Sequence, residues 1–478
     1  MDSLRPIQVS SPLRLRLGER RAILMFGDFL MALFSLGLAL FFWGISERFY
    51  DFPYEFLQKR TPLWFYFLPL VWMVLLIELY DIHNANDWRK TIRGIAVAAL
   101  AGTILYLVLF FYYVDPPRSL LPRRGVLGFL VTASILTLVW RGIYIRIFTT
   151  SRFLRNVILV GGGKSGTILL QVVNSLKVKP FSIIGIIDDD PQKQGMIIEG
   201  YKLLGSSEDL LRLVEKLHIS DVFVAITGEI QGGMFQALLD AQQMGVDITR
   251  MPVVYEELLG RVPIQSLEAN WILRSFVDES RVSGFYELGK RIIDVIGGLI
   301  GTIGMLIVFP FVAIGIMLDD GRPIFYGQMR SGRGGHPYRI LKFRTMRRDA
   351  EADGLPKWAS EDDKRTTRVG KILRRTHFDE LPQFLNVLRG EMSLVGPRAE
   401  RPELVSMFQS HIPFYRARLL VKPGITGWAQ VNYGYASSVE ETMVKLEYDL
   451  YYVKHRRLMI DLVILLRTPA RMLGFRGR

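Results

Sequence analysis

Four long apolar stretches occupy the first third of the chain, at residues 22–43, 62–80, 95–114 and 126–148. Each is close to the ~20 residues that span the hydrocarbon core as a helix, and none has the polar face of a helix on the surface of a soluble protein. The pattern therefore predicts an N-terminal four-helix transmembrane bundle at residues 1–150. Helices buried in a large soluble domain are the alternative, which four such stretches in succession disfavour.

Basic residues at the ends of these stretches predict their orientation. They precede the first stretch, lie between the second and third, and accompany the fourth: Arg14 to Arg21, Arg89, Lys90, Arg93, Arg141, Arg146, Arg152 and Arg155. Because cytoplasmic flanks carry the excess of Lys and Arg, we expect both ends of the bundle on the cytoplasmic side of the membrane. Three arginines after the third stretch weaken this argument without reversing it.

The pattern changes to short apolar strands and amphipathic stretches at residues 151–283, which predicts an α/β Rossmann-like domain. A strand at 157–160 leads into Gly161, Gly163 and Gly166, a helix follows at 167–176, and a second strand at 183–187 ends at Asp188. This spacing fits the dinucleotide fingerprint, with Asp188 at the ribose position. A tight turn that only packs the helix on its strand is the alternative, and the sequence leaves both open. Later strands are expected at 222–226 and 247–251.

A third unit is predicted at residues 284–478, beginning with an apolar segment at 291–318 that contains Pro310. A crossing helix would place everything after residue 320 outside the cell, away from cytoplasmic nucleotides. Basic residues flank the segment on both sides, so neither end is favoured to cross. We therefore expect a proline-broken re-entrant helix at residues 291–318, with an ordinary fifth crossing as the alternative.

Composition narrows the chemistry. The chain has no cysteine, which excludes disulfides, zinc thiolates and cysteine nucleophiles. Any metal must be held by oxygen or histidine, and with six scattered histidines a hard cation such as Mg²⁺ on carboxylates is the better expectation. Lys and Arg outnumber Asp and Glu by 60 to 46, which with the high apolar content suits contact with membrane lipids better than nucleic-acid binding.

Two adjacent carboxylates, Asp379 and Glu380, form the central motif of the third unit. They precede Pro382 and an apolar stretch that stops at Gly390, which predicts a helix with its proline in the first turn and its glycine just past the end. Acidic residues that cap a helix are the ordinary explanation. Adjacent residues also point in different directions, so one carboxylate could attack a substrate while the other binds a metal.

Basic side chains near this motif are candidate phosphate ligands. Lys342 and Arg344 follow a β-like stretch at 338–341, Arg375 shortly precedes the dyad, and Arg398 follows Pro397 in a rigid turn. For most of the other basic residues of this unit, including Arg416 and Arg418, solvated surface or lipid headgroup contacts are equally good explanations.

These motifs together resemble the polyprenyl-phosphate hexose-1-phosphate transferases of the monotopic phosphoglycosyl transferase superfamily. The matching segments, in order, are Lys342-Phe343-Arg344-Thr345-Met346, Asp379-Glu380-Leu381-Pro382-Gln383, Ser393-Leu394-Val395-Gly396-Pro397-Arg398, Lys422-Pro423-Gly424-Ile425-Thr426-Gly427-Trp428-Ala429-Gln430 and Tyr448-Asp449-Leu450-Tyr451-Tyr452. The four-helix front and the Rossmann-like middle are similar to the large-form members. Two positions depart from the family pattern, with Ala399 where a second proline is common and Phe309 where smaller members often have serine before the proline.

The resemblance implies a reaction. Asp379 would attack the β-phosphorus of a UDP-sugar, release UMP and form a sugar-phosphoryl aspartate, which undecaprenyl phosphate would then displace. Mg²⁺ would be held through Glu380 and Asp379. Lys342, Arg344, Arg375 and Arg398 would bind substrate phosphates, and Asp449 would lie on the metal side. The resemblance also implies a homodimer in the inner membrane of a bacterium and a role in exopolysaccharide, capsule or O-antigen synthesis, with glucose slightly favoured over galactose as the sugar.

Two other function classes fit part of the sequence. A nucleotide-sugar oxidoreductase or dehydratase would explain the glycine-rich turn, but it has no need of the membrane segments or the dyad. A non-enzymatic scaffold for polysaccharide export would explain the membrane half and leave the C-terminal motifs without a role. Release of UMP from a UDP-sugar separates the three.

Overall fold

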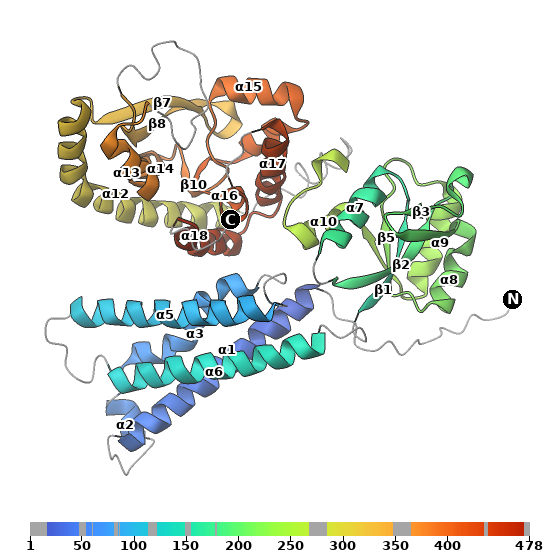
Figure 1. Cartoon of the computed structure of the whole chain (residues 1–478), viewed down its shortest axis with the longest axis horizontal. Coiled ribbons are helices and arrows are strands. Elements are labelled where there is room, and N and C mark those ends of the chain that lie inside the picture. Colours follow the sequence, from blue (N-terminus) through green and yellow to red (C-terminus); the bar gives the residue numbers. More distant parts are fainter. Residues whose placement is uncertain are drawn as a thin grey trace. The chain divides into compact units, whose positions relative to one another are not determined.

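The computed structural model describes residues 17–46, 54–59, 61–80, 85, 87–112, 122–148, 154–176, 179–266, 284–347, 365–434 and 438–472 (Figure 1). The chain divides into two compact units, Met1–Val254 and Tyr255–Arg478. The first contains the apolar helices and an α/β sheet domain, and the second contains the dyad.

Three helices of the first unit are long and apolar enough to cross a membrane, α1 (Leu17–Ser46), α5 (Trp88–Tyr112) and α6 (Arg123–Phe148). The prediction of one continuous helix at 62–80 is wrong. This stretch is divided into η1 (Leu63–Phe67), α3 (Leu68–Leu75) and η2 (Ile77–Tyr80), and α2 (Tyr54–Lys59) precedes it. Pro69 lies in the first turn of α3, where a proline without an N–H starts a helix more readily than it continues one.

A buried ion pair ties this bundle together. Arg141 of α6 donates to Asp28 of α1 at 2.6 Å and to the carbonyl of Leu79 in η2 at 2.8 Å, and neither charged side chain is exposed. Arg141, which the sequence suggested as a flanking charge, is therefore an internal connection between three helical elements. Removing one member of such a pair leaves an uncompensated buried charge.

We expect Arg141→Met to destabilise the bundle by about 3–5 kcal/mol, because Asp28 loses its counter-ion. The double variant Asp28→Leu/Arg141→Met should recover much of that loss, since it removes both charges. Thermal unfolding of the purified chain in detergent measures both effects. Equal destabilisation by the single and the double variant would contradict the ion-pair explanation.

A six-stranded sheet with the order β3-β4-β2-β1-β5-β6 follows the bundle. All neighbouring strands are parallel except β3 and β4. The strands are β1 (Arg155–Val160), β2 (Phe181–Ile187), β3 (Ile197–Ile198), β4 (Tyr201–Gly205), β5 (Asp221–Val224) and β6 (Asp247–Arg250). The predicted Rossmann-like topology and its four predicted strands are confirmed.

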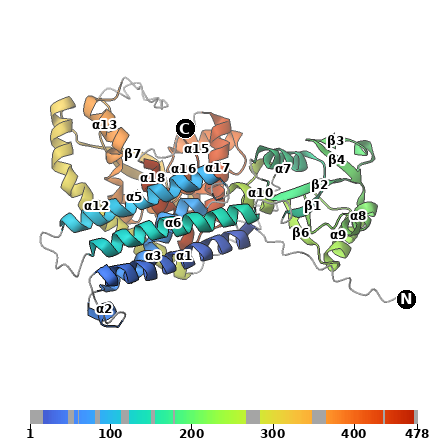
Figure 2. The same ribbon diagram turned by 60° about the horizontal axis from the view of Figure 1, so that its bottom comes forward.

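Helices cover both faces of this sheet, with α7 (Lys164–Ser175) on one face and α8 (Leu210–Lys216) and α9 (Gly232–Gln243) on the other (Figures 1 and 2). Short turns η4 (Pro191–Lys193) and η5 (Ser207–Asp209) connect strands and helices. Helix α7 begins at Lys164, three residues before the predicted start, because Gly163 in extended conformation already forms the N-cap.

The second unit is mainly helical. Its helices are α12 (Gly284–Asp320), α13 (Arg368–Thr376), α14 (Gln383–Arg389), α15 (Pro402–His411), α16 (Trp428–Asn432), α17 (Val439–Lys454) and α18 (Leu458–Met472). Strands β7 (Phe325–Ser331) and β8 (Pro337–Phe343) form an antiparallel hairpin, and β9 (Ser393–Val395) pairs in parallel with β10 (Gly424–Thr426). Its 3₁₀ turns are η6 (Ile264–Ser266), η8 (Arg333–Gly335), η9 (Phe378–Glu380) and η10 (Tyr415–Leu420).

Residues 255–266 pack into this second unit. Val262 and Ile264 lie in its hydrophobic core, and Trp428 donates to the carbonyl of Gly260 at 2.7 Å. Glu256, in α10 (Met251–Leu259), accepts from Lys454 at 3.0 Å and is 2.7 Å from the His455 ring nitrogen. The boundary that we predict at residue 283 lies outside the described residues and stays a prediction.

Helix α12 has one covered side and one exposed apolar side. Along the covered side, Asp294 accepts from Ser393 Oγ and the Leu394 amide, Phe309 stacks on Phe325 and Phe343, and Ile316 packs near Leu373. The exposed side carries Phe285, Leu288, Ile292, Val295, Ile296, Leu299, Ile300, Ile303, Leu306, Ile307, Phe311, Ile314, Met317 and Leu318. The helix bends sharply in Figure 1, for which the internal Pro310 gives the physical reason.

Candidate active site

The dyad lies in a short turn between two helices. Asp379 and Glu380 belong to η9, which follows His377 in the left-handed conformation (φ 59°), and Pro382 is the N-cap of α14. Gly390 ends α14 at φ 82°, as predicted. As predicted, the dyad lies at the N-terminal end of α14, in a 3₁₀ turn that the left-handed His377 separates from α13 (Arg368–Thr376).

Glu380 is held by two cations. Lys342 of β8 donates to Glu380 Oε1 at 2.8 Å, and Arg398 donates to the same oxygen at 2.5 Å and to Oε2 at 3.5 Å. Burial alone would raise the pKa of the Glu380 carboxyl, but Arg398 and Lys342 outweigh it and hold that pKa far below its usual range. Glu380 is therefore ionised at all physiological pH values.

Asp379 has a different environment. Its side chain is buried, and its carboxylate makes no hydrogen bond or ion pair with any residue that the structure describes. Burial raises the pKa of Asp379 above its ordinary value, which the nearby cations Lys342, Arg398 and Arg374 oppose without cancelling. The two neighbouring carboxylates are thus prepared for different roles, Glu380 fixed in an ion pair and Asp379 uncommitted.

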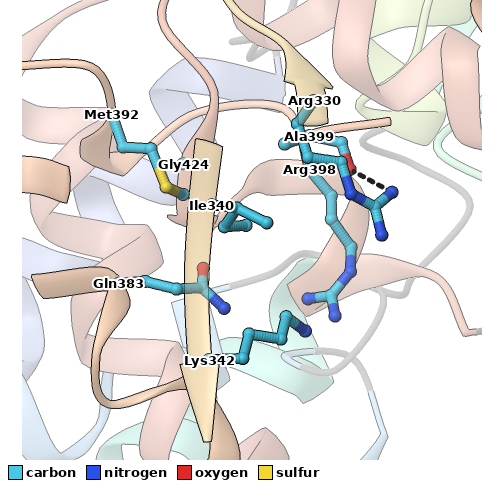
Figure 3. Close-up of a pocket in the computed structure, with 8 residues that line it drawn as sticks. All are labelled: Arg330, Ile340, Lys342, Gln383, Met392, Arg398, Ala399 and Gly424. Carbon is cyan, nitrogen blue, oxygen red and sulfur yellow. Dashed lines mark hydrogen bonds between the residues drawn. The ribbon is translucent and has the colours of Figure 1, made fainter. Parts of the chain in front are cut away.

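A small pocket lies beside Glu380, Lys342 and Arg398, here called the Glu380 cluster (Figure 3). Its volume is about 20 Å³, and its lining combines cations and an amide with backbone and apolar groups: Arg330, Ile340, Lys342, Gln383, Met392, Arg398, Ala399 and Gly424. Lys342 and Arg398 were predicted from the sequence as phosphate ligands. Arg330 was not, because its sequence neighbourhood gives no sign that it lies beside the dyad. Gln383 belongs to the dyad motif, but the sequence gave it no role.

The two other predicted arginines lie elsewhere. Arg344 donates to the carbonyls of Asp320 and Gly321 at 2.9 and 2.7 Å, so it caps the C-terminal end of α12. Arg375 is exposed on α13. Its neighbour Arg374 instead lies close enough to lower the pKa of Asp379 while it donates to Thr345 Oγ1 at 3.0 Å. The two arginines point in different directions, since one residue turns a helical side chain through about 100°. Phosphate binding by Arg344 and Arg375 stays a prediction.

Asp449 lies behind the site. It pairs with Arg418 at 2.8 Å, and both side chains are nearly inaccessible, so Arg418 is not a headgroup contact. Arg418 donates in turn to the main-chain carbonyl of Arg398 at 2.8 Å. Asp449 therefore supports the turn that presents Arg398 to Glu380, and its position on the metal side stays a prediction.

The turn at 398–400 is fixed from several sides. Arg330 donates to the carbonyl of Ala399 at 3.3 Å (dashed line in Figure 3), the Ser331 amide donates to the carbonyl of Glu400 at 2.9 Å, and Lys445 donates to the Glu400 carboxylate at 2.9 Å. Although burial alone would raise it, the pKa of Glu400 is lowered to about 2 by Lys445 and Arg418. These contacts fix the main chain of the turn, which holds the Arg398 side chain beside Glu380.

The glycine-rich turn in the first unit has the predicted geometry. Gly161 has φ 102°, and a Cβ on Gly166 would lie 2.1 Å from the carbonyl oxygen of Gly161, so only glycine fits there. Asp188 accepts from the Gly162 amide at 2.7 Å and pairs with Lys193 at 3.1 Å. The Asp188 carboxylate thus faces its own glycine loop. Nucleotide binding by Gly161, Gly163, Gly166 and Asp188 stays a prediction.

A metal ion would have few protein ligands here. Within the described parts of the chain, no three His, Cys, Asp or Glu side chains are grouped as a metal site. Glu380 pairs with two of the pocket cations, Lys342 and Arg398, and Asp379 is its neighbour in the chain. This fits Mg²⁺, which commonly binds one or two carboxylates and completes its octahedron with water and substrate phosphates.

Comparison with known proteins places the chain. Residues 285–474 match a family described as bacterial sugar transferase, and residues 76–252 match one described as CoA-binding domain. A UDP-glucose:undecaprenyl-phosphate glucose-1-phosphate transferase of Caulobacter vibrioides is 40% identical over 189 residues, which are 39% of this chain and 70% of that protein. This chain belongs to the bacterial sugar transferase family. The matched region of this sugar transferase contains the dyad, the Glu380 cluster and α12 from its second residue onward.

Two longer relatives match more of the chain. A UDP-N-acetylgalactosamine-undecaprenyl-phosphate N-acetylgalactosaminephosphotransferase of Aeromonas hydrophila is 39% identical over 49% of this sugar transferase and 54% of its own length. A UDP-glucose:undecaprenyl-phosphate glucose-1-phosphate transferase of Xanthomonas campestris is 31% identical over 58% of this chain and 57% of its own. The chain thus spans somewhat more than half the length of these relatives.

Proposed function

We propose that this sugar transferase moves a hexose 1-phosphate from a UDP-sugar to undecaprenyl phosphate and forms undecaprenyl-diphospho-sugar and UMP. The observation that carries the proposal is the buried, uncommitted Asp379 carboxylate beside a cluster of two cations on Glu380. The names of the relatives support the same reaction class. An oxidoreductase or a scaffold would leave this arrangement without a use.

The residues divide the work as follows. An Asp379 oxygen attacks the β-phosphorus, the bond to the bridging oxygen breaks, and that oxygen leaves with UMP. The phosphate oxygen of undecaprenyl phosphate then displaces Asp379 from the same phosphorus and regenerates the carboxylate. Two steps through a covalent carboxylate avoid the direct encounter of two anionic phosphates. Lys342 and Arg398 neutralise phosphoryl charge, and Arg374 favours the ionised form of Asp379.

Mg²⁺ fits the acidic pair. Glu380 and Asp379 would hold it, and when bound it would offset charge on the diphosphate. Glu380 also keeps Lys342 and Arg398 at one point when no anion is present, because both bond to its Oε1.

Glucose is our first choice of sugar. The Xanthomonas and Caulobacter relatives are named for glucose, while the Aeromonas relative makes N-acetylgalactosamine the second candidate in place of galactose. Assembly as a homodimer, a place at the start of exopolysaccharide, capsule or O-antigen synthesis, and nucleotide binding by the Rossmann-like domain stay predictions.

Helix α12 supports a placement of the second unit at the membrane surface. Its covered side contacts the second unit from Tyr286, which donates to Asp461, to Asp319, which accepts from the Val369 amide. A helix covered by a polar domain along its whole length cannot be surrounded by lipid, while its other side exposes a continuous apolar surface. We infer that α12 enters one leaflet and returns, which keeps Asp379 at the cytoplasmic face, where UDP-sugars and lipid phosphates meet.

Asp379→Asn should reduce UMP release from UDP-glucose by at least about a thousandfold, because the amide cannot act as the nucleophile. The measurement uses purified protein, undecaprenyl phosphate and Mg²⁺, with UDP-N-acetylgalactosamine and UDP-galactose in parallel. Asp247→Asn, an exposed carboxylate in the other unit, is the matched control. Undiminished turnover in Asp379→Asn would reject this nucleophile.

The rate should fall on acidification with a single protonation step. Because the pKa of Asp379 is raised, its nucleophilic form is lost at a higher pH than for an exposed aspartate, while Glu380 stays ionised. Arg374→Met removes a cation that lowers this pKa, so the acid limb of kcat/KM should move to higher pH. Initial rates across the acidic range test this. A limb that stays in place in Arg374→Met contradicts the assignment.

Cysteine labelling tests the side of the membrane. The chain has no native cysteine, so Ser410→Cys, on the exposed surface of α15, reports on the second unit alone. We expect a membrane-impermeant maleimide to label it only after spheroplasts are permeabilised. Ser119→Cys, between the third and fourth predicted membrane segments, should be labelled without permeabilisation. Labelling of Ser410→Cys in intact spheroplasts would show that α12 crosses.

A further inference from the structure

Gln383 is a buried amide beside the acidic pair. It is the first residue of α14, three and four positions after Glu380 and Asp379, a spacing that brings helical side chains to one side. Only 3% of the residue is exposed, yet it lines the pocket with Lys342 and Arg398 (Figure 3).

The carboxamide of Gln383 has no hydrogen bond to any residue within the described ranges. The contrast with Asn386, one turn further along α14, is direct. Asn386 is fully buried and satisfied, since it accepts from the Leu341 amide at 3.0 Å and donates to the Arg339 carbonyl and the Glu391 carboxylate at 2.9 and 2.6 Å. A buried amide without a protein partner loses free energy that only water or a ligand can restore.

The size and charge of the pocket select the ligand group. The space beside Gln383 is small, about 20 Å³, so the group next to this amide is about the size of a water molecule. The three cationic side chains in its lining favour an oxyanion. A phosphoryl oxygen satisfies both conditions, and because it can only accept, the amide must donate.

We propose that Gln383 Nε2 donates a hydrogen bond to a non-bridging oxygen of the phosphoryl group that Asp379 attacks. Lys342 and Arg398 offset the negative charge of this phosphoryl group, and the hydrogen bond from Gln383 orients it. The inference rests on the proposed function for the identity of the phosphoryl group, while the binding of an oxyanion by Gln383 can be tested without it.

Binding of inorganic phosphate to the full chain in detergent is the first test. Gln383→Met keeps the length of the side chain and removes its donor, so its Kd for phosphate should rise about tenfold, the usual effect of one hydrogen bond to a charged group. Gln383→Glu should bind more weakly still, because it adds a negative charge. Equal phosphate affinity in wild type and Gln383→Met, which would mean that only water occupies the pocket, overturns the proposal.

Gln430→Met is the matched control. Gln430 is also partly buried, but it donates to the carbonyl of Ile425 at 3.0 Å, so its loss is a structural one. We expect this variant to lower Tm and to leave phosphate affinity unchanged. A fall in phosphate affinity as large as that of Gln383→Met would overturn the proposal, since any lost amide would then have the same effect.

Steady-state kinetics give the second test. A donor to the phosphoryl group should lower kcat of Gln383→Met by a similar factor for UDP-glucose and UDP-N-acetylgalactosamine, so their ratio of kcat/KM stays constant. A changed ratio would mean that Gln383 contacts the sugar and would overturn the proposal. If wild type releases no UMP, the proposed function fails, while a weaker phosphate affinity in Gln383→Met would still support the oxyanion donor.

Discussion

The shared carboxylate oxygen of Glu380 is the contact on which the rest of the site depends. Lys342 comes from the β7–β8 hairpin and Arg398 from the turn after β9. Two cations from separate parts of the fold therefore meet at one carboxylate oxygen. Two cations near one another repel, so an ionised Glu380 between them is required to keep both in place. Its strongly lowered pKa is the consequence of that arrangement, since each cation stabilises the charge that holds the other.

Much of the remaining second unit supports this contact from behind. Asn386 fixes β8 by bonding to main-chain groups on both sides of Ile340, which sets the position of Lys342. Asp449 and Arg418 fix the main chain of Arg398. Motifs far apart in sequence therefore serve one purpose, and several residues that look catalytic in sequence are supports. This explains why Asp449 lies in a conspicuous motif and yet is almost inaccessible.

The sequence was sufficient wherever local chemistry decides the structure. The length of the apolar stretches predicted three of the four bundle helices. Short apolar runs between amphipathic stretches predicted the parallel strands, and Pro382 with Gly390 predicted α14. The sequence was insufficient where long-range packing decides. Neighbours that are distant in the chain decide how residues 62–80 divide into short helices and why Arg344 caps α12. They also decide that Arg374, rather than Arg375, lies near Asp379. Gln383 was quoted as part of the dyad motif without a role, because its burial beside Lys342 and Arg398 is visible only in the structure.

The segment at residues 255–266 has a consequence for how this protein can be divided. Val262 and Ile264 fill the core of the second unit, and Glu256 and Gly260 bond to α17 and Trp428. A fragment that begins at Gly284, the start of α12, would lack Val262 and Ile264 from this core and would lack the Glu256 partner of Lys454. A fragment that keeps the core of the second unit complete therefore has to begin at or before Tyr255, within α10.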